Sequence, residues 1–138
     1  MSTSISSFED LVSAARQQAE PQRLLFVFAR VELPDDCTPQ QRARFEAGTG
    51  GALAPLACVD KTPEELGTFN ELLDESRQFV QEWTIVFAAA LSGKRGCAPT
   101  SQEAEAPLNS MVEAIKAGAT GAFIPFDTRG RPVIFGQS

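Results

Sequence analysis

The chain has 138 residues, of which 18 are acidic and 12 basic, so its formal net charge is −6, and 43% of its residues are hydrophobic. This length and composition predict one globular domain, residues 1–138, that is large enough to bury a hydrophobic core. Nucleic acids and anionic membranes are bound by concentrated cationic surfaces, and no basic run exceeds Lys94-Arg95, so we expect neither partner.

The first predicted elements are a helix and a buried strand. Ser7 is a suitable helix cap, and an apolar stripe after it predicts a helix that Pro21 ends. The apolar run 24–29 that follows has no polar alternation. Such a run is typical of a strand covered on both faces.

The next two elements are a helix and an edge strand. Thr38 followed by Pro39 predicts a helix start, and Gly48 ends that helix. Residues 52–59 predict a strand, which we place at a sheet edge because Pro55 has no amide hydrogen to donate.

The segment Thr62-Pro63 predicts a third helix, which leads into the apolar stretch 83–91. That stretch reads Trp-Thr-Ile-Val-Phe-Ala-Ala-Ala-Leu, and its β-branched and aromatic first half favours a second strand buried on both faces. A buried helix is the alternative, because alanine favours helix.

The C-terminal part predicts a helix and a hairpin. Thr100 is a candidate cap, but Pro107 lies within the span, so the helix either kinks at this proline or begins there. The apolar runs 122–126 and 132–135, separated by a short segment with a glycine, predict a β-hairpin.

Together these elements predict an α/β (or α+β) fold with a mixed sheet of about five strands, helices on both faces and a C-terminal β-hairpin. Alternating helices and strands indicate parallel crossovers. Only the strands at 24–29 and 83–91 lack proline. We therefore expect these two strands to be parallel neighbours in the centre, with the strands of Pro55 and Pro132 at or near the edges.

This arrangement suggests a ligand site. Parallel central strands end at the same end of the sheet, where open α/β sheets bind their ligands. The loops after the two strands carry the candidate ligand-binding residues, which are Asp35, Asp36, Ser92, Lys94 and Arg95. An acidic loop facing a basic one could bind a small anionic metabolite. The alternative is two solvated turns whose ion pairs contribute little.

The chain contains no histidine, the commonest general base and metal ligand. The cysteines Cys37, Cys58 and Cys97 form no CxxC pair. Their odd number fits free thiols in a reducing compartment, and we place Cys58, in an apolar strand, in the core. We expect no cofactor, no metal site and no catalytic residue, although an enzyme based on carboxylate, Lys, Cys or Ser stays open.

No segment approaches the ~20 apolar residues of a membrane span, and the first seven residues lack the features of a signal peptide, so we expect a cytoplasmic protein. A non-catalytic binding or protein-interaction module is the favoured function. Its partner would be a second copy or another protein, bound at an exposed apolar patch on the hairpin that contains Phe126 and Phe135.

Several stretches resemble a family of short bacterial proteins, and these are residues 23–28, 33–36, 45–48, 59–65, 121–127 and 130–133. Members of that family are often labelled "ribonucleotide reductase subunit alpha". The resemblance implies a self-contained bacterial cytosolic domain of uncharacterised function. It implies no catalytic residue, because the three cysteines match no radical or redox-active cysteine motif of the reductase.

Overall fold

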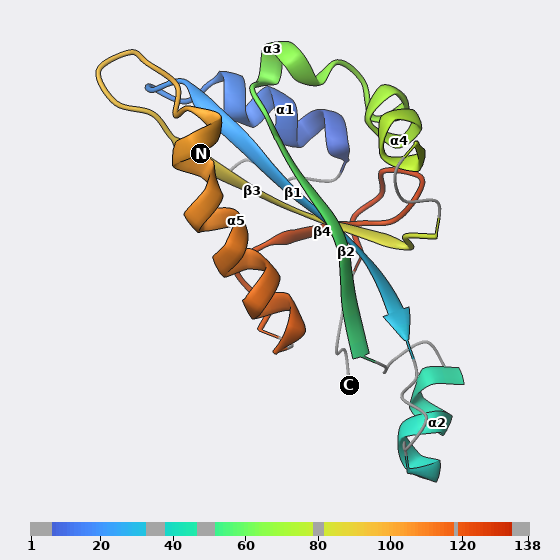
Figure 1. Cartoon of the computed structure of the whole chain (residues 1–138). Coiled ribbons are helices and arrows are strands. Elements are labelled where there is room, and N and C mark those ends of the chain that lie inside the picture. Colours follow the sequence, from blue (N-terminus) through green and yellow to red (C-terminus); the bar gives the residue numbers. More distant parts are fainter. Residues whose placement is uncertain (1–6, 33–37, 47–51, 79–81, 118, 134–138) are drawn as a thin grey trace.

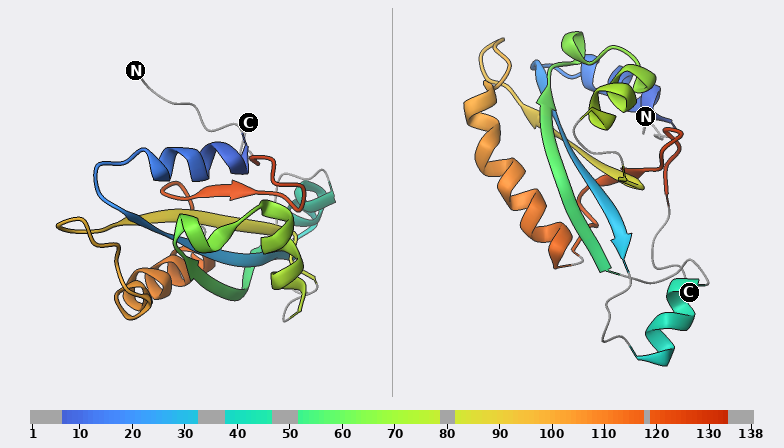
Figure 2. Two further views of the ribbon diagram at one scale, coloured as in Figure 1. Left: turned by 90° about the horizontal axis from the view of Figure 1, so that it is seen from above. Right: turned by 45° about the vertical axis from the view of Figure 1, so that its right-hand side comes forward.

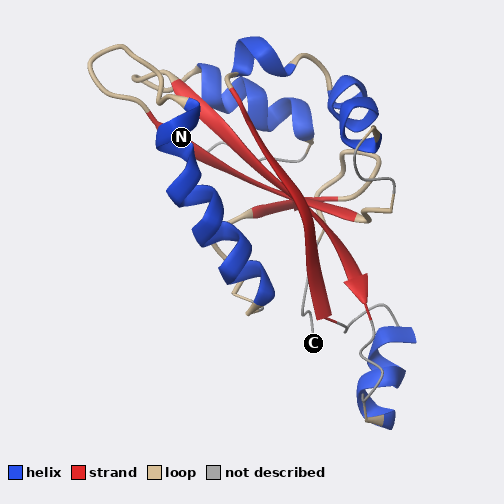
Figure 3. Cartoon of the chain, viewed as in Figure 1, coloured by secondary structure: helices blue, strands red, loops and turns tan. Residues whose placement is uncertain are grey.

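The computed structural model of the chain describes residues 7–32, 38–46, 52–78, 82–117 and 119–133. Their elements, in chain order, are α1 (Phe8–Arg16), β1 (Gln22–Glu32), α2 (Pro39–Glu46), β2 (Ala52–Lys61), α3 (Pro63–Leu66), α4 (Phe69–Arg77), β3 (Ile85–Ser92), α5 (Ser101–Lys116) and β4 (Ile124–Phe126). The strands form one sheet in the order β2-β1-β3-β4 (Figures 1 and 3).

The central strands are β1 and β3, as predicted, but every neighbouring pair in this sheet is antiparallel. The predictions of a mixed sheet and of parallel central strands are therefore wrong. For β1 and β2 the physical reason lies in α2, which connects them. A crossover to a parallel neighbour needs a helix that packs on the sheet. The described side chains of α2 are all exposed, and the helix lies beyond the ends of β1 and β2 (Figure 1).

Helices cover both faces of the sheet, as expected (Figure 2). Successive strand residues point to opposite faces, so each central strand contributes to two cores. One core, under α1, α3 and α4, contains Phe8, Leu11, Ala15, Leu24, Phe26, Phe28, Leu66, Phe69, Leu72, Trp83, Val86, Ala88 and Phe126. The other, under α5, contains Leu25, Val27, Ala29, Ile85, Phe87, Ala104, Leu108, Met111 and Ile115.

The apolar stretch 83–91 forms strand β3 from Ile85 onward, which decides against the buried helix. Its alanines match large residues on β1, because Phe26 lies opposite Ala88 while the smaller Val27 lies opposite Phe87. Trp83 precedes β3 and is only 3% exposed. Strand pairing therefore combines large and small side chains at the centre of each core.

Pro55 lies in the edge strand β2, as predicted. The other edge is β4, which contains Pro125, while the predicted strand of Pro132 is reduced to an isolated bridge. Cys58, which we expected in the core, is exposed because β2 has no strand on its outer side among the described residues. A register irregularity between Phe28 and Ala29 leaves Leu56 as an extra residue in β2, a β-bulge.

The predicted C-terminal hairpin and fifth strand are not confirmed. The three-residue strand β4 meets the following segment only at an isolated bridge between Phe126 and Pro132, and Val133 N donates to Pro125 O over 3.0 Å. Phe126 is fully buried, so it cannot form the expected exposed patch, and Phe135 lies outside the described residues.

The helix caps follow the sequence signals closely. Ser7, Thr62 and Thr100 cap α1, α3 and α5 through their side-chain oxygens. The predicted third helix is divided into α3 and α4 at Gly67, which has a φ of +67° that suits glycine. Helix α5 runs through Pro107, because buried residues on both sides of the proline pack on the sheet. None of the helices described is long and apolar enough to cross a membrane.

Candidate functional site

The structure separates the two loops that were predicted to form the ligand site. Ser92 ends β3 and pairs with Gln22, the first residue of β1. The C-terminal ends of β1 and β3 therefore lie at opposite ends of the sheet, and the predicted crevice has no geometric basis. Asp35 and Asp36 follow the far end of β1 and lie outside the described residues.

The other candidates stay together at the near end, where β2 and β3 both finish. Both strands are antiparallel to β1, so their C-terminal ends coincide. Ser92, Lys94 and Arg95 are exposed there, and the half-buried Asp60 and Lys61 end β2 at the same end of the sheet. This end of the sheet is the candidate functional site.

A tight hairpin follows β3 at this end. Lys94 N donates to Cys97 O and Cys97 N donates to Lys94 O, each over 3.0 Å. The two residues between them, Arg95 and Gly96, have φ values of 54° and 79°. Positive φ at both central positions is the requirement of a type I′ turn, in which glycine is favoured and arginine is uncommon. The hairpin therefore holds the Arg95 side chain at its exposed tip.

The hairpin is anchored to the segment between α1 and β1. Gly93 N donates to Pro21 O over 2.8 Å, and Gly96 N donates to the Glu20 carboxylate Oε1 over 2.9 Å. A Cβ at Gly93 would lie 2.0 Å from Cys97 O and 2.7 Å from Pro21 O, so only glycine allows this approach. The hydrogen bond from Gly96 N orients the Glu20 carboxylate toward the hairpin.

Gln22 adds a third contact between the same two segments. Its side-chain Nε2 donates to Ser92 Oγ over 3.1 Å and to Glu20 O over 3.0 Å. Gln22 is only 8% exposed, and a buried amide is costly unless it is hydrogen-bonded. These two bonds satisfy the amide hydrogens, and the bond to Ser92 connects the start of β1 to the residue that precedes the hairpin.

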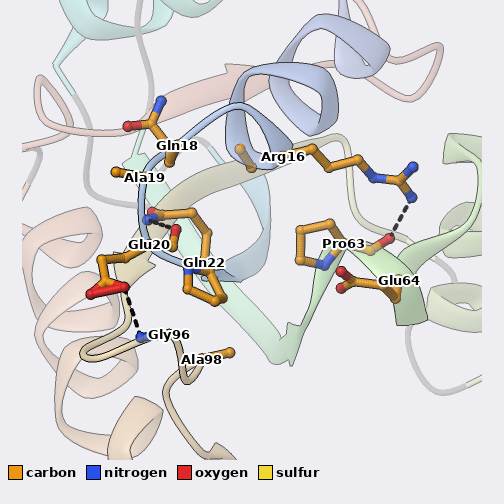
Figure 4. A pocket seen from close by; sticks show the side chains of 11 residues that line it. Arg16, Gln18, Ala19, Glu20, Gln22, Pro63, Glu64, Gly96 and Ala98 are labelled. Carbon is orange, nitrogen blue, oxygen red and sulfur yellow. Dashed lines mark hydrogen bonds between the residues drawn. The ribbon is translucent and has the colours of Figure 1, made fainter.

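A hollow of about 610 Å³ lies between this hairpin, the end of α1 and the start of α3 (Figure 4). We call it the α1–α3 hollow. It is lined by Ala15, Arg16, Gln18, Ala19, Glu20, Pro21, Gln22, Pro63, Glu64, Gly96 and Ala98. Alanines and prolines supply apolar wall, while carboxylate, amide and guanidinium groups surround it. On the α3 side, Arg16 Nη2 donates to Pro63 O over 3.2 Å.

A second polar cluster joins β1, β2 and α5 at the same end of the sheet. Arg23 Nη1 lies 2.6 Å from Asp60 Oδ2, and Arg23 Nε donates to Pro99 O. Ser101 Oγ, at the start of α5, donates to the same Asp60 oxygen. The Arg23 and Asp60 side chains are 14% and 17% exposed, so this partly buried ion pair joins β1 to β2, and the Ser101 hydrogen bond connects the start of α5 to it.

Glu65 borders this cluster. The backbone N–H of Thr62, and then its hydroxyl, hold the pKa of Glu65 below its ordinary value of 4.5, and the nearby Arg23 guanidinium acts in the same direction. These hydrogen bonds form the capping box of α3. The shift is therefore explained by helix capping. In the part of the chain that the structure describes, no group of three or more Cys, Asp or Glu residues is placed to hold a metal ion.

Sequence reasoning missed most residues of the hollow. Arg16, Glu20, Gln22 and Glu64 come from the ends of elements, where charged and amide side chains usually face solvent. The signal that did exist was the glycine pair around Lys94 and Arg95, which indicated a tight turn. Nothing in the sequence alone indicated which segment that turn would contact.

Comparison with protein-family models, with curated proteins and with solved structures gave no match for this chain.

Proposed function

We propose that the chain is a non-catalytic binding module and that the α1–α3 hollow is its binding site. One observation carries the proposal. Three segments that are distant in sequence converge on the hollow, and hydrogen bonds from Gly93 and Gly96 join two of them.

The volume of the hollow is that of a small-molecule site, and the hollow is open at the surface, where Ala19 and Glu64 are exposed. Such sites typically have volumes of roughly 300–1,000 Å³, apolar walls and a few fixed polar groups. Here the fixed groups are the Glu20 carboxylate, held by Gly96 N, and the Arg16 guanidinium, held by Pro63 O. Groups that are already oriented lose little conformational entropy on binding, which favours affinity.

The test is a thermal-shift screen of the intact chain against a panel of small metabolites. A ligand at about 100 times its Kd should stabilise the fold by about 2.7 kcal/mol. Ala19→Trp, which places a large side chain at the exposed lining of the hollow, should abolish the shift. Ala117→Trp, at the exposed end of α5, is the matched control and should keep it. A panel that produces no shift, or a shift that Ala19→Trp leaves intact, would contradict the proposal.

We also propose a second function, self-association through the outer edge of β2, because of one specific observation. Residues 52–59 carry no charge, and Leu56 at 37% exposure is the large hydrophobic residue that stands out on the surface of the described chain. In Figure 1, β2 crosses in front of the other strands with helices on either side. Edge strands with unpaired backbone groups can bind another strand.

A second copy suits this edge. Two chains of net charge −6 repel each other, and an uncharged edge lets them approach without opposing like charges. A two-fold antiparallel pairing centred on Leu56 would bring the two Leu56 side chains together and keep Asp60 and Lys61 of each copy away from their counterparts. Pro55 has no amide hydrogen to donate, and the bulge interrupts the regular spacing of backbone groups in β2. Only part of this edge can therefore bond to a second copy, which predicts weak rather than obligate association.

Light scattering coupled to size-exclusion chromatography over a range of concentrations tests this second function. The chain should show a concentration-dependent dimer, and Leu56→Lys should be monomeric because it places a charge at the edge. Ala106→Lys, on the exposed surface of α5, is the control and should dimerise as the original chain does. A chain that is monomeric at every concentration refutes the idea.

We further propose that the module acts in the bacterial cytoplasm. The exposed, unpaired thiols of Cys58 and Cys97 fit a reducing compartment. The bacterial origin rests on the resemblance described above.

A further inference from the structure

We infer that the ligand of the α1–α3 hollow is an aliphatic molecule with two cationic groups, such as a diamine or polyamine, an inference that rests on the proposed binding function. The property that points to this class is the distribution of charge around the hollow.

The hollow contains two carboxylates and one guanidinium. Figure 4 shows Glu20 on the side of the β3–α5 hairpin and Glu64 on the side of α3, with the carboxylate of Glu64 directed toward the hollow. Two negative groups on opposite sides can each receive one end of a molecule with two positive charges. Charge-assisted hydrogen bonds of this kind are the strong ones in proteins.

The Glu20 carboxylate is oriented but not saturated. Among the described residues, its Oε1 accepts one hydrogen bond, from Gly96 N. An ionised carboxylate has about four acceptor positions, so Glu20 keeps capacity for an ammonium or guanidinium donor. The type I′ turn holds Gly96 in place, so the fold also sets the orientation of the Glu20 carboxylate.

Arg16 is the one cationic side chain of the lining, so the lining has two negative charges and one positive. The Arg16 guanidinium donates to Pro63 O and lies on the α3 side, so part of its donor capacity is directed at the protein itself. The chain as a whole carries a net charge of −6, which attracts cations over a longer range.

The apolar wall accounts for the aliphatic part of the ligand. Alanine and proline residues also line the hollow, and methylene groups gain free energy when they leave water against such a surface. A metal cation or a free ammonium ion would make no use of this wall. A flexible chain of methylenes between two amines would use both the wall and the two carboxylates.

The test is isothermal titration calorimetry of the intact chain with putrescine and spermidine at a fixed ionic strength. Glu20→Gln and Glu64→Gln should each weaken binding about tenfold or more, the loss expected when a hydrogen bond to a charged group is removed. Glutamine at position 20 can still accept from Gly96 N, so the fold should be kept. Glu105→Gln, on the exposed surface of α5, is the matched control and should bind as before.

The outcomes separate the two levels of the proposal. Equal weakening in all variants, including Glu105→Gln, would mean non-specific attraction to an acidic surface and would overturn the inference. A different result would leave the binding function standing and show the charge inference to be wrong. In that result an anionic or neutral compound produces a thermal shift, Ala19→Trp abolishes the shift, and Glu20→Gln leaves it unchanged. If neither amines nor the wider panel bind, both are wrong.

Discussion

Removing the hydroxyl of Ser76 should lower the free energy of unfolding by more than the loss of one small atom would, because the buried hydroxyl makes two hydrogen bonds. The indole Nε1 of Trp83 donates to Ser76 Oγ over 2.8 Å, and Ser76 Oγ donates to Leu73 O over 2.7 Å. Ser76 is 0% exposed and Trp83 is 3% exposed, so water cannot replace the lost acceptor. Ser76→Ala therefore leaves a buried N–H without a partner.

The expected cost can be worked from these contacts. An unsatisfied buried donor costs about 1–3 kcal/mol. Alanine returns roughly half a kcal/mol, because it favours helix more than serine does and position 76 lies in α4. We expect a net loss of about 0.5–2.5 kcal/mol in the free energy of unfolding, which lowers the Tm of a chain of this size by roughly 2–12 °C.

The assay is urea and thermal unfolding followed by tryptophan fluorescence and circular dichroism. Trp83 is the single tryptophan and the chain has no tyrosine, so the fluorescence reports on this site alone. Ser110→Ala, on the exposed face of α5, is the control and should change stability by less than about 0.5 kcal/mol.

A double-mutant cycle isolates the hydrogen bond. In the Trp83→Phe background, Ser76→Ala should cost much less, since phenylalanine has no N–H that loses its acceptor. The reasoning is refuted if Ser76→Ala is as stable as Ser110→Ala, or if its cost is the same in both backgrounds.

Two further predictions concern the turn and the cap. Gly93→Ala should lower the free energy of unfolding by at least about 2 kcal/mol, because its Cβ would lie 2.0 Å from Cys97 O, whereas Gly121→Ala has open space and should be near neutral in thermal unfolding. The pKa of Glu65 is lower in the folded chain, so its carboxylate stabilises the fold above pH 4.5 and this contribution disappears as the pH falls through the lowered pKa. Glu65→Gln should therefore show a smaller loss of stability between pH 6 and pH 3 in urea titrations, and a pH dependence identical to the original chain would contradict the Thr62 capping argument.

The sequence by itself determined the local structure of this protein. Caps such as Ser7 and Thr100 act through their own side chains on the next turn of backbone, so a segment of four residues suffices to specify them. The side chains of the run 24–29 are all apolar, so a strand that contains this run has to be covered on both faces, as it is here. Pro55 cannot donate to a neighbouring strand, and this places β2 at an edge in any sheet that contains it.

Only the tertiary structure decided the direction of the strands and the location of the site. An apolar run satisfies its backbone equally well beside a parallel or an antiparallel neighbour, and its side chains alternate in the same way in both. Helix α2 has no apolar stripe to place on the sheet, and β2 returns antiparallel beside β1. Helices α3 and α4 do pack on the sheet, and they connect β2 to β3, which is antiparallel to the other side of β1. The hollow needs Glu20, Glu64 and Gly96 together. Their meeting depends on β1 lying antiparallel between β2 and β3, which is a property of the whole sheet and of no single segment.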